Sequence, residues 1–483
     1  MCKRRVILPV ALSTNFLLPP GASRAADLFR ELAKRTTWRK KESVWRNCLD
    51  QSRTAQSREG GQITVNVMQA VEFAARRKVD VRFTRTLFGQ VFTALRARDP
   101  KYLRVALNDR AFECKMAGMN AIDAGGPYRE VLERMCEELQ SSVLPLFVPS
   151  ANARAAVGDG RDRHVPAALP ASAAARALRL AAYQFVGQLM GLAIRSQNLL
   201  PLNLPSIVWK QLTGGEAPTA DDVRAIDVLT SQLLQSLKKD TSADVFNMTM
   251  RDCQFEVVPN GASEPIALGA SAGGGGGGSG GGGDGSTRQQ RRRVTAANRD
   301  QFHDALLSFR LGEFTEQCAA MRRGLATVVP YLPLALLSWH ELERQVCGGG
   351  MDLDLLQRHT VYEGFSAADS RARLFWQMMH ERFDDAQRAK FLSFVWGRSR
   401  LPTSDATWGD RPFKIDAMRA RGPVDLALPI SHTCFFSIEL PDYSTVDVMT
   451  ERVTFAIINC TSIDGDGSGA GDVNIDVGDD AEL

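Results

Sequence analysis

The stretch LPISHTCFFSIEL, residues 428–440, decides the fold class of the C-terminal part of the chain. In its second half, apolar Phe436, Ile438 and Leu440 alternate with polar neighbours, a period of two that is typical of a strand with one buried face. Residues 413–417 alternate in the same way and predict a second strand. Pro429 favours a loop ahead of the later strand.

A helix is expected directly after this strand. Ser444 and Asp447 form the capping pattern S-x-x-D, which is typical of the first turn of a helix. The apolar residues that follow share one helical face, and they are Met449, Val453, Ala456, Ile457 and Cys460. Residues 352–464 are therefore predicted to form a small α/β unit.

The chain before this unit is helical by pattern. Residues 178–194 are almost continuously apolar and predict a buried helix. Within the 352–464 unit, Asp385 is the predicted N-cap of a further helix over 386–396, and Gly397 its C-terminal stop. The whole chain is therefore predicted to have an α+β fold, with a mostly helical larger part and a small α/β part.

A glycine-rich connection, CGGGM at residues 347–351, lies between these two parts. Three consecutive glycines restrict the backbone little, so they suit either a hinge or a plain loop, and composition alone does not decide between the two.

The composition is that of a folded protein. The chain has 483 residues, of which 44% are hydrophobic and 24% charged, and these values exclude a wholly disordered chain. The net charge of +4 does not by itself indicate nucleic-acid binding. The nine cysteines include no C-x-x-C pair, which argues against zinc-finger and thioredoxin sites and favours a reducing, intracellular compartment.

Several segments differ from this average. Residues 270–293 include ten glycines within 273–283 and end in an arginine-rich run, and they predict a disordered insertion. Arginines in this run could attract nucleic acid, but no aromatic residues lie between them to stack on bases. Residues 150–165 are polar and predict a second loop, and the acidic tail 465–483 is predicted to be disordered.

The N-terminal 60 residues form a basic segment that is predicted to be partly ordered. They carry 13 Lys and Arg against 5 Asp and Glu. Residues 6–23 are uncharged and faintly resemble a signal peptide, but their prolines argue against a spanning helix, so an ordinary N-terminal segment is preferred.

The residues that could carry chemistry are in the opening stretch. Cys434 follows a proline-containing loop, and His432 lies two residues earlier, so that both side chains would share a face in extended backbone. An imidazole or the Thr433 hydroxyl beside a thiol can favour the nucleophilic thiolate. Spacing alone leaves open the alternative that Cys434 is simply a small buried side chain.

Other catalytic patterns are missing from the sequence. It contains no G-x-S-x-G, no H-E-x-x-H and no Walker loop, and its six histidines have no metal-ligand spacing. Neither a cofactor nor a metal is expected.

Several strings, taken in order, resemble one family, the HECT ubiquitin ligases. IDAGGPYRE at 122–130 resembles the family's D-x-G-G-x-x-R-E element, and residues 185–209 and 310–330 resemble helices of its larger lobe. In the smaller lobe, FLSFVWGRSRLP at 391–402 follows F-L-x-F-V-x-G-x-x-R-L-P. LPISHTCF at 428–435 matches L-P-x-S-H-T-C-F, which holds the family's catalytic cysteine. The Phe-Phe pair after that cysteine is similar to the residues at this place in the HERC-like branch of the family.

The resemblance implies a bilobal fold. Residues 61–347 correspond to the larger N-lobe, which docks a ubiquitin-conjugating enzyme, with its dock around 210–300. Residues 348–351 correspond to a glycine-rich hinge, and residues 352–464 to the smaller C-lobe with the catalytic cysteine.

The resemblance also implies a chemistry. Cys434 is expected to accept ubiquitin as a thioester and to pass it to substrate lysines, with His432 and Thr433 in supporting roles. The expected partners are a conjugating enzyme, ubiquitin and protein substrates that the sequence does not identify, with neither nucleic acid nor a membrane. The expected location is the cytoplasm, with the nucleus as an alternative. A catalytically weak docking module for charged conjugating enzymes is the alternative function.

Overall fold

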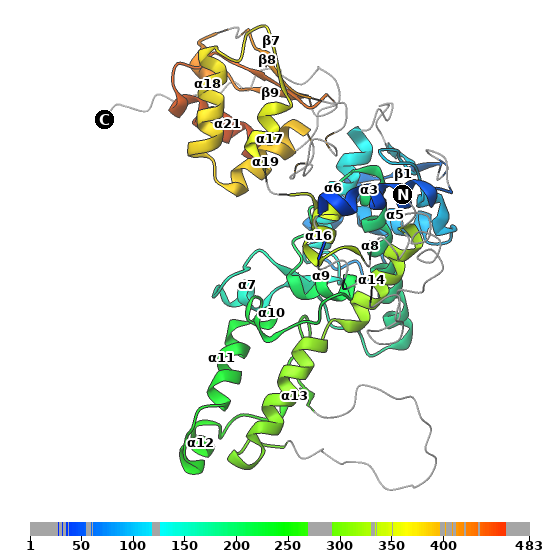
Figure 1. Cartoon of the computed structure of the whole chain (residues 1–483), viewed down its shortest axis with the longest axis vertical. Helices are drawn as coiled ribbons and strands as arrows, with labels where there is room; N and C mark the ends of the chain where they lie inside the picture. The colour runs from blue at the N-terminus through cyan, green and yellow to red at the C-terminus, as the bar shows by residue number, and fades with distance from the viewer. Residues whose placement is uncertain are drawn as a thin grey trace. The chain divides into compact units, whose positions relative to one another are not determined.

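The computed structural model describes residues 28, 31, 35–36, 38–54, 59, 61–117, 126–268, 292–329, 334, 336–349, 351–396, 401, 408, 412–419, 422–432 and 435–459. The chain divides into two compact units, here called unit 1 (residues 1–118 and 127–349) and unit 2 (residues 119–126 and 350–483). Figure 1 shows the elements of both, and each unit is described by itself.

Unit 1 is mostly helical. Its helices are α3 (Trp38–Gln51), α4 (Val67–Ala75), α5 (Leu87–Leu95), α6 (Gly126–Leu139), α7 (Ala151–Ala155), α8 (Ala173–Ser196), α9 (Ser206–Thr213), α10 (Ala220–Arg224), α11 (Val228–Leu237), α12 (Ala243–Thr249), α13 (Arg299–Gly312), α14 (Thr315–Val328) and α16 (Trp339–Cys347), with short 3-10 turns η1 (Pro100–Leu103) and η2 (Ala296–Asn298). Its described strands form short pairs, β1 (Gln62–Val65) parallel to β2 (Glu113–Met116), β3 (Phe147–Pro149) antiparallel to β4 (His164–Pro166), and β5 (Glu256–Val257) antiparallel to β6 (Ile266–Ala267).

The main core of unit 1 is organised around α8, which contains the predicted helix 178–194 and extends beyond it at both ends. Helix α14 packs along α8, and the two backbones touch at glycines. A Cβ on Gly187 would overlap the carbonyl oxygen of Met321, and one on Gly324 would overlap that of Gln184. Glycine at both positions therefore allows a helix–helix contact closer than side chains would permit.

Helix α8 is also long and apolar enough to cross a membrane, by length and composition. In the structure, however, 61% of its most apolar window is buried. Burial by protein on this scale is typical of the central helix of a protein core.

The N-terminal helix α3 is attached to this core by two basic side chains. The Lys41 ammonium lies 2.8 Å from Oε2 of Glu341, at the start of α16. The fully buried Arg195 guanidinium donates to the carbonyl of Leu49 and to the hydroxyl of Ser52 at the end of α3. Burial lowers the pKa of Arg195 to about 10, so its charge is retained at neutral pH.

Helices α11, α12 and α13 and strands β5 and β6 form a second, smaller core within unit 1. Its buried members are Leu234, Leu237, Phe246, Phe255, Val257, Leu268, Val294, Phe302 and Leu306. The expected insertion at 270–293 falls between described residues of this part, and all but its last two residues lie outside the described chain.

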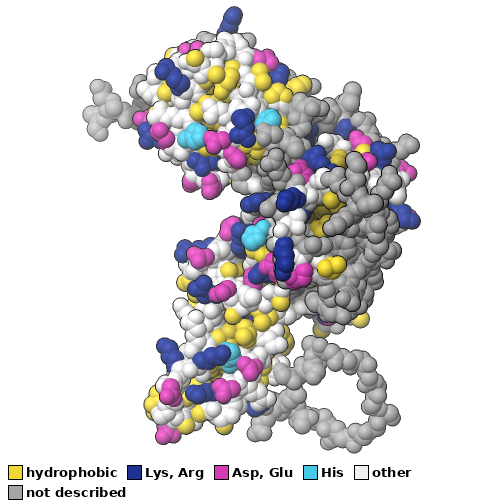
Figure 2. Space-filling model, in the orientation of Figure 1, with side chains coloured by type: hydrophobic (Ala, Val, Ile, Leu, Met, Phe, Trp, Pro, Cys, Tyr) yellow, Lys and Arg dark blue, Asp and Glu magenta, His cyan; other side chains and the backbone are white. Residues whose placement is uncertain are grey.

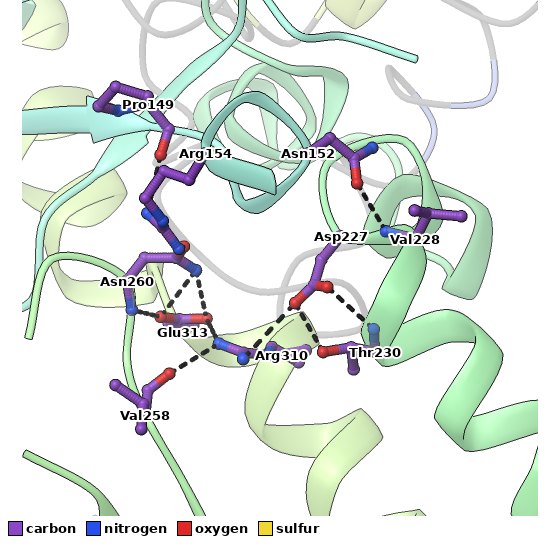
Figure 3. A network of polar contacts seen from close by, with 10 residues as sticks. All are labelled: Pro149, Asn152, Arg154, Asp227, Val228, Thr230, Val258, Asn260, Arg310 and Glu313. Atoms are coloured by element: carbon purple, nitrogen blue, oxygen red, sulfur yellow. Dashed lines mark hydrogen bonds and ion pairs between the residues drawn. The ribbon is translucent and has the colours of Figure 1, made fainter. Parts of the chain in front are cut away.

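A polar network holds this second core against the rest of unit 1 (Figure 3). Arg310 of α13 pairs with Asp227, the N-cap of α11, at 3.5 Å and with Glu313 at 2.9 Å. Glu313 in turn accepts hydrogen bonds from Asn260, whose side-chain oxygen accepts from Arg154 of α7 at 2.9 Å. The side chains of Arg310, Asp227 and Glu313 are all largely buried, so the loss of Arg310 would leave two buried carboxylates without their cation.

The prediction of a polar loop over 150–165 is wrong at both ends, because α7 lies within it and β4 begins within it. The Ser150 hydroxyl accepts from the amide of Ala153 and caps α7, and Asn152 accepts from the amide of Val228 at 2.7 Å (Figure 3). The polar residues that favoured a loop therefore serve as a helix cap and as a tie to α11.

Unit 2 contains a four-stranded sheet and helices. Its elements are α17 (Leu353–Arg358), β7 (Thr360–Glu363), α18 (Ser370–Gln377), the short π-helix η3 (Met378–Arg382), α19 (Asp385–Trp396), β8 (Phe413–Ala417), the 3-10 turn η4 (Val424–Leu426), β9 (Ile430–His432), β10 (Ser437–Leu440) and α21 (Val446–Asn459). The strand order is β7-β8-β10-β9, with β7 and β10 parallel to β8 and β9 antiparallel to β10.

One face of this sheet carries the core. Phe413, Ile415, Ile438 and Leu440 are fully buried, as their alternation predicts. The predicted apolar face of α21 is buried at Met449, Val453, Ala456 and Ile457, whereas Cys460 lies outside the described residues. Unit 2 is therefore an α/β unit, and with the helical unit 1 the α+β class is confirmed.

Two of the predicted helix caps are wrong by one residue. The carboxylate of Asp384, not Asp385, accepts the amide of Gln387 at 2.8 Å. At α21, Thr445 accepts the amide of Val448, and Ser444 instead bonds Asp425, the amide to Oδ1 at 2.9 Å and the hydroxyl to Oδ2 at 2.6 Å. A carboxylate from another segment therefore competes successfully for the serine that was predicted as a cap.

Candidate active site

Of the residues predicted to carry chemistry, His432 is described, and it belongs to the β9–β10 hairpin of unit 2. Strand β9 ends at His432, which pairs across the hairpin with Ser437. The carbonyl of His432 accepts the amide of Phe435 at 3.0 Å, which closes the hairpin. Thr433 and Cys434, the two residues between them in the chain, lie outside the described residues.

The two phenylalanines after Cys434 have opposite environments. The Phe436 side chain is buried and stacks on the Trp396 ring, with centroids 4.2 Å apart. Phe435 is 71% exposed. Phe436 has a φ of 53°, in the left-handed region, and this local reversal separates the two rings. Phe436, predicted as the first strand residue, therefore belongs to the turn.

His432 pairs with an acidic residue of the neighbouring strand. Its Nε2 atom lies 2.9 Å from Oε1 of Glu439. Because His432 is opposite Ser437, Glu439 is its diagonal neighbour on the same face of the sheet. The histidine side chain is 43% exposed and the glutamate 38%.

More charged residues share this face of the sheet. The register places Glu363 of β7, Asp416 of β8 and Glu439 of β10 side by side, and the Lys414 ammonium lies 2.8 Å from Oε1 of Glu363. Partial burial raises the pKa of the Asp416 carboxyl, and the negative charge of Glu363 raises it further. Its hydrogen bond with Glu363 raises the pKa of Lys414. The face opposite the core is therefore acidic and reaches from β7 to the hairpin.

The segment that enters β9 is fixed by contacts with the start of α21 and its first turns. Ser444 donates twice to Asp425, and these bonds lower the pKa of that carboxyl. The Tyr443 hydroxyl donates to the carbonyl of Ala427 at 2.7 Å, and Arg452 donates to that of Asp425 at 3.0 Å. Helix α21 and the two residues Tyr443 and Ser444 that precede it therefore hold the approach to the hairpin.

Among the described cysteines, none has the exposure of a typical reactive thiol. Cys48, Cys114, Cys136, Cys318 and Cys347 are buried, and Cys253 is partly buried. Burial raises the pKa of the Cys48, Cys253 and Cys318 thiols, which disfavours the nucleophilic thiolate. Within the described part of the chain, no cluster of three or more His, Cys, Asp or Glu residues could hold a metal ion.

Comparison with known families decides the identity of the fold. The HECT-domain (ubiquitin-transferase) model matches residues 133–464, which is more than half of the chain. The chain belongs to the HECT-domain family. The matched segment includes the β9–β10 hairpin, and the family resemblance predicted from the sequence is confirmed.

Relatives of this HECT chain are named as ubiquitin ligases. It is 34% identical over 387 residues to the E3 ubiquitin-protein ligase HERC2 of Homo sapiens, covering 79% of the chain and 7% of the relative. It is 25% identical over 357 residues to the E3 ubiquitin-protein ligase RSP5 of Chaetomium thermophilum, covering 71% of the chain and 38% of the relative. The identity to HERC2 agrees with the HERC-like resemblance. The chain spans less than a tenth of the length of HERC2, and ubiquitin transfer is the activity that the family and these names indicate.

The HECT motif identified His432 but not its partner. Glu439 lies seven residues later and becomes its neighbour only through the hairpin register. The alternation of apolar and polar residues in the strand places Glu439 on the solvent face. This was the one signal in the sequence that could have pointed to Glu439.

Proposed function

We propose that this chain is a HECT-type ubiquitin-protein ligase that carries ubiquitin as a thioester on Cys434 and transfers it to substrate lysines. The observation that carries the proposal is the LPISHTCF motif at the β9–β10 hairpin of a HECT domain. Cys434 is bonded to Phe435, and consecutive Cα atoms are about 3.8 Å apart, so its chemistry would take place at the end of this hairpin.

The reaction would have two steps. The Cys434 thiolate would attack the thioester that joins ubiquitin's C-terminus to a conjugating enzyme, and the enzyme's thiolate would leave. A substrate lysine amine would then attack the new thioester, forming an isopeptide bond and releasing the Cys434 thiolate. Covalent catalysis of this kind divides one difficult transfer into two easier ones. Because a thioester is exchanged for a thioester, the first step needs no further energy source.

Exposed apolar side chains near the hairpin favour the proposal that the thioester carries a protein. Leu428 and Ile430 are exposed along the segment that leads to the hairpin, and Phe435 follows Cys434 directly. Exposed apolar side chains that gather in one place mark sites where a protein surface meets a partner. We assign them to the part of ubiquitin that lies next to the thioester.

A separate surface on unit 1 suits the conjugating enzyme. Leu229 of α11 and Val245 and Met248 of α12 are 54%, 55% and 74% exposed. Figure 2 shows hydrophobic side chains among charged ones on the part of unit 1 that Figure 1 labels α11, α12 and α13. These residues lie within the 210–300 segment that the family resemblance assigns to the dock, and we propose them as its apolar contact, here called the α11–α12 patch.

Movement between the two units is the third part of the proposal. We propose that residues 348–351 are the hinge through which the thiol meets the charged enzyme and then the substrate. Gly348 has a φ of 80°, which neither proline nor most other residues adopt, and its amide bonds Arg344. Proline at Gly349 and Gly350, with Gly348 kept, should therefore slow transfer while both units remain folded, and an unchanged rate would argue against a hinge.

The central test is the adduct on Cys434. The chain is incubated with a charged conjugating enzyme and separated on a gel without reducing agent. We expect an adduct that thiol removes, that is absent in Cys434→Ala and that is retained in the matched control Cys253→Ala. Binding of the charged enzyme without such an adduct would contradict the proposal and favour a docking module.

A further inference from the structure

The His432–Glu439 pair lies where the second step of the proposed reaction would take place. Strand β9 ends at His432, and only Thr433 separates it from Cys434 in the chain. The carbonyl of His432 closes the hairpin with the amide of Phe435, so the backbone that carries the imidazole is fixed. The Glu439 carboxylate fixes the ring itself through Nε2 at 2.9 Å.

Folding stability does not account well for this pair. Both side chains are about two-fifths exposed, and ion pairs at such exposure contribute little to the free energy of folding. The same face offers a direct comparison, because Lys414 and Glu363 form a pair of the same cross-strand kind at 2.8 Å, on the strands farther from the hairpin. If the His432–Glu439 pair had only a structural role, removing it should affect the chain no differently from removing the Lys414–Glu363 pair.

A carboxylate bonded to one nitrogen of a neutral imidazole fixes the tautomer. With Nε2–H donating to Glu439, the lone pair of Nδ1 can accept a proton. Within the described residues, Nδ1 of His432 has no hydrogen-bond partner. The other charged groups on this face, Asp416 and Lys414 on β8, belong to the strand on the far side of β10 from His432.

Building on the proposed function, we infer that Glu439 is a positioning residue that holds His432 to accept the proton of the attacking lysine. The amine nitrogen forms a bond to the carbonyl carbon of the thioester, and the carbon–sulfur bond breaks. The electron pair leaves on Cys434 as thiolate, and the proton lost from nitrogen passes to Nδ1 of His432. Returning that proton to solvent restores the neutral ring.

The experiment separates loading of Cys434 from its discharge. Single-turnover loading is measured with a charged conjugating enzyme, and discharge is measured after the enzyme is removed and free lysine is added. Glu439→Gln keeps an acceptor for Nε2–H but removes the charge, and Glu439→Leu removes both. We expect unchanged loading, discharge that is about fivefold slower in Glu439→Gln and slower still in Glu439→Leu, and partial recovery in Glu439→Asp.

Two further measurements distinguish positioning from a structural role. Imidazole added to His432→Ala should restore part of its discharge rate, because a soluble base can replace the missing ring. The matched control, Glu363→Gln, should discharge at the rate of the unmodified chain, and its thermal melting should resemble that of Glu439→Gln.

Discharge that is unchanged in Glu439→Leu, or discharge in His432→Ala that imidazole does not restore, would overturn this inference and leave the proposed function intact. A parallel loss of loading and discharge would also overturn it, because that result indicates a distorted hairpin. If the unmodified chain forms no adduct on Cys434, the proposed function fails, and this inference fails with it.

Discussion

Phe436 lies on Trp396 with centroids 4.2 Å apart and ring planes 13° apart, although its backbone has a φ of 53°. For a residue other than glycine, this conformation costs on the order of 1 kcal/mol or more. The buried ring offsets that cost, because Phe413 also lies against it at 4.9 Å. The aromatic core therefore fixes the turn that follows Cys434.

Replacing this ring tests its role. Phe436→Ala should lower the free energy of unfolding of unit 2 by about 3–5 kcal/mol, through lost burial and a cavity. The matched control is its neighbour Phe435→Ala, which should cost about 0.5 kcal/mol or less because that ring is exposed. Denaturant unfolding followed by tryptophan fluorescence measures both. Equal losses in the two variants would contradict the assignment.

The contact between α8 and α14 makes a second prediction. Gly324→Ala should destabilise unit 1 by about 1–3 kcal/mol, because its methyl group would overlap the Gln184 carbonyl. Gly215→Ala is the control, since a Cβ there meets nothing within 4 Å. Thermal unfolding should show a lower Tm for Gly324→Ala alone. A normal Tm would mean that the two helices can separate at little cost.

Glu138 makes stability depend on pH. Its carboxylate accepts the amides of Leu87 and Phe88 at the start of α5, but burial raises its pKa to about 7, and the nearby Asp80 charge adds to the rise. Because the folded-state pKa lies above the ordinary value, the folded form binds the proton more tightly. Its contribution to stability is complete below about pH 4.5 and is lost as the pH rises through 7.

The measurement compares the unmodified chain with Glu138→Gln between pH 5 and 8. The free energy of unfolding of the unmodified chain should decrease by on the order of 1–3 kcal/mol relative to the variant, which does not titrate. Glu138→Gln should be less stable at pH 5, because its amide nitrogen cannot accept an N–H bond. Parallel pH curves for the two proteins would exclude Glu138 as the source.

The proposed role of the α11–α12 patch in docking is tested by placing a negative charge on it. Met248→Glu should slow loading of Cys434 by on the order of tenfold, which corresponds to about 1.4 kcal/mol of docking free energy. Val81→Glu is the matched control, since Val81 is an exposed apolar residue of unit 1 outside the patch. Loading kinetics at several concentrations of charged enzyme measure the effect. Equal slowing by both substitutions would place the dock elsewhere.

Periodicity predicted those elements whose own residues carry a continuous apolar face. Helix α8, strand β8 and the buried face of α21 were identified in this way. Caps were less predictable, because Ser444 has two available partners and only the folded chain brings Asp425 to it. Strand β9 was missed because three residues at a sheet edge are too few to show a period.

In the candidate site, too, local features could be predicted from the sequence and features that depend on the folded chain could not. The motif around Cys434 is local and can be read from the sequence, whereas the pairing of His432 with Glu439 depends on the hairpin register. The exposure of Phe435 beside the burial of Phe436 depends on one backbone angle, which no alternation of residue types encodes. Cys434 and Thr433 lie outside the described residues, and their roles stay predictions.

The attachment of residues 425–427 to Tyr443, Ser444 and Arg452 has a practical consequence for anyone shortening this protein. A version that stops soon after β10 would keep every letter of the cysteine motif. It would nevertheless lose the anchors that hold the chain entering that motif. The minimal catalytic fragment should therefore extend at least to the end of α21.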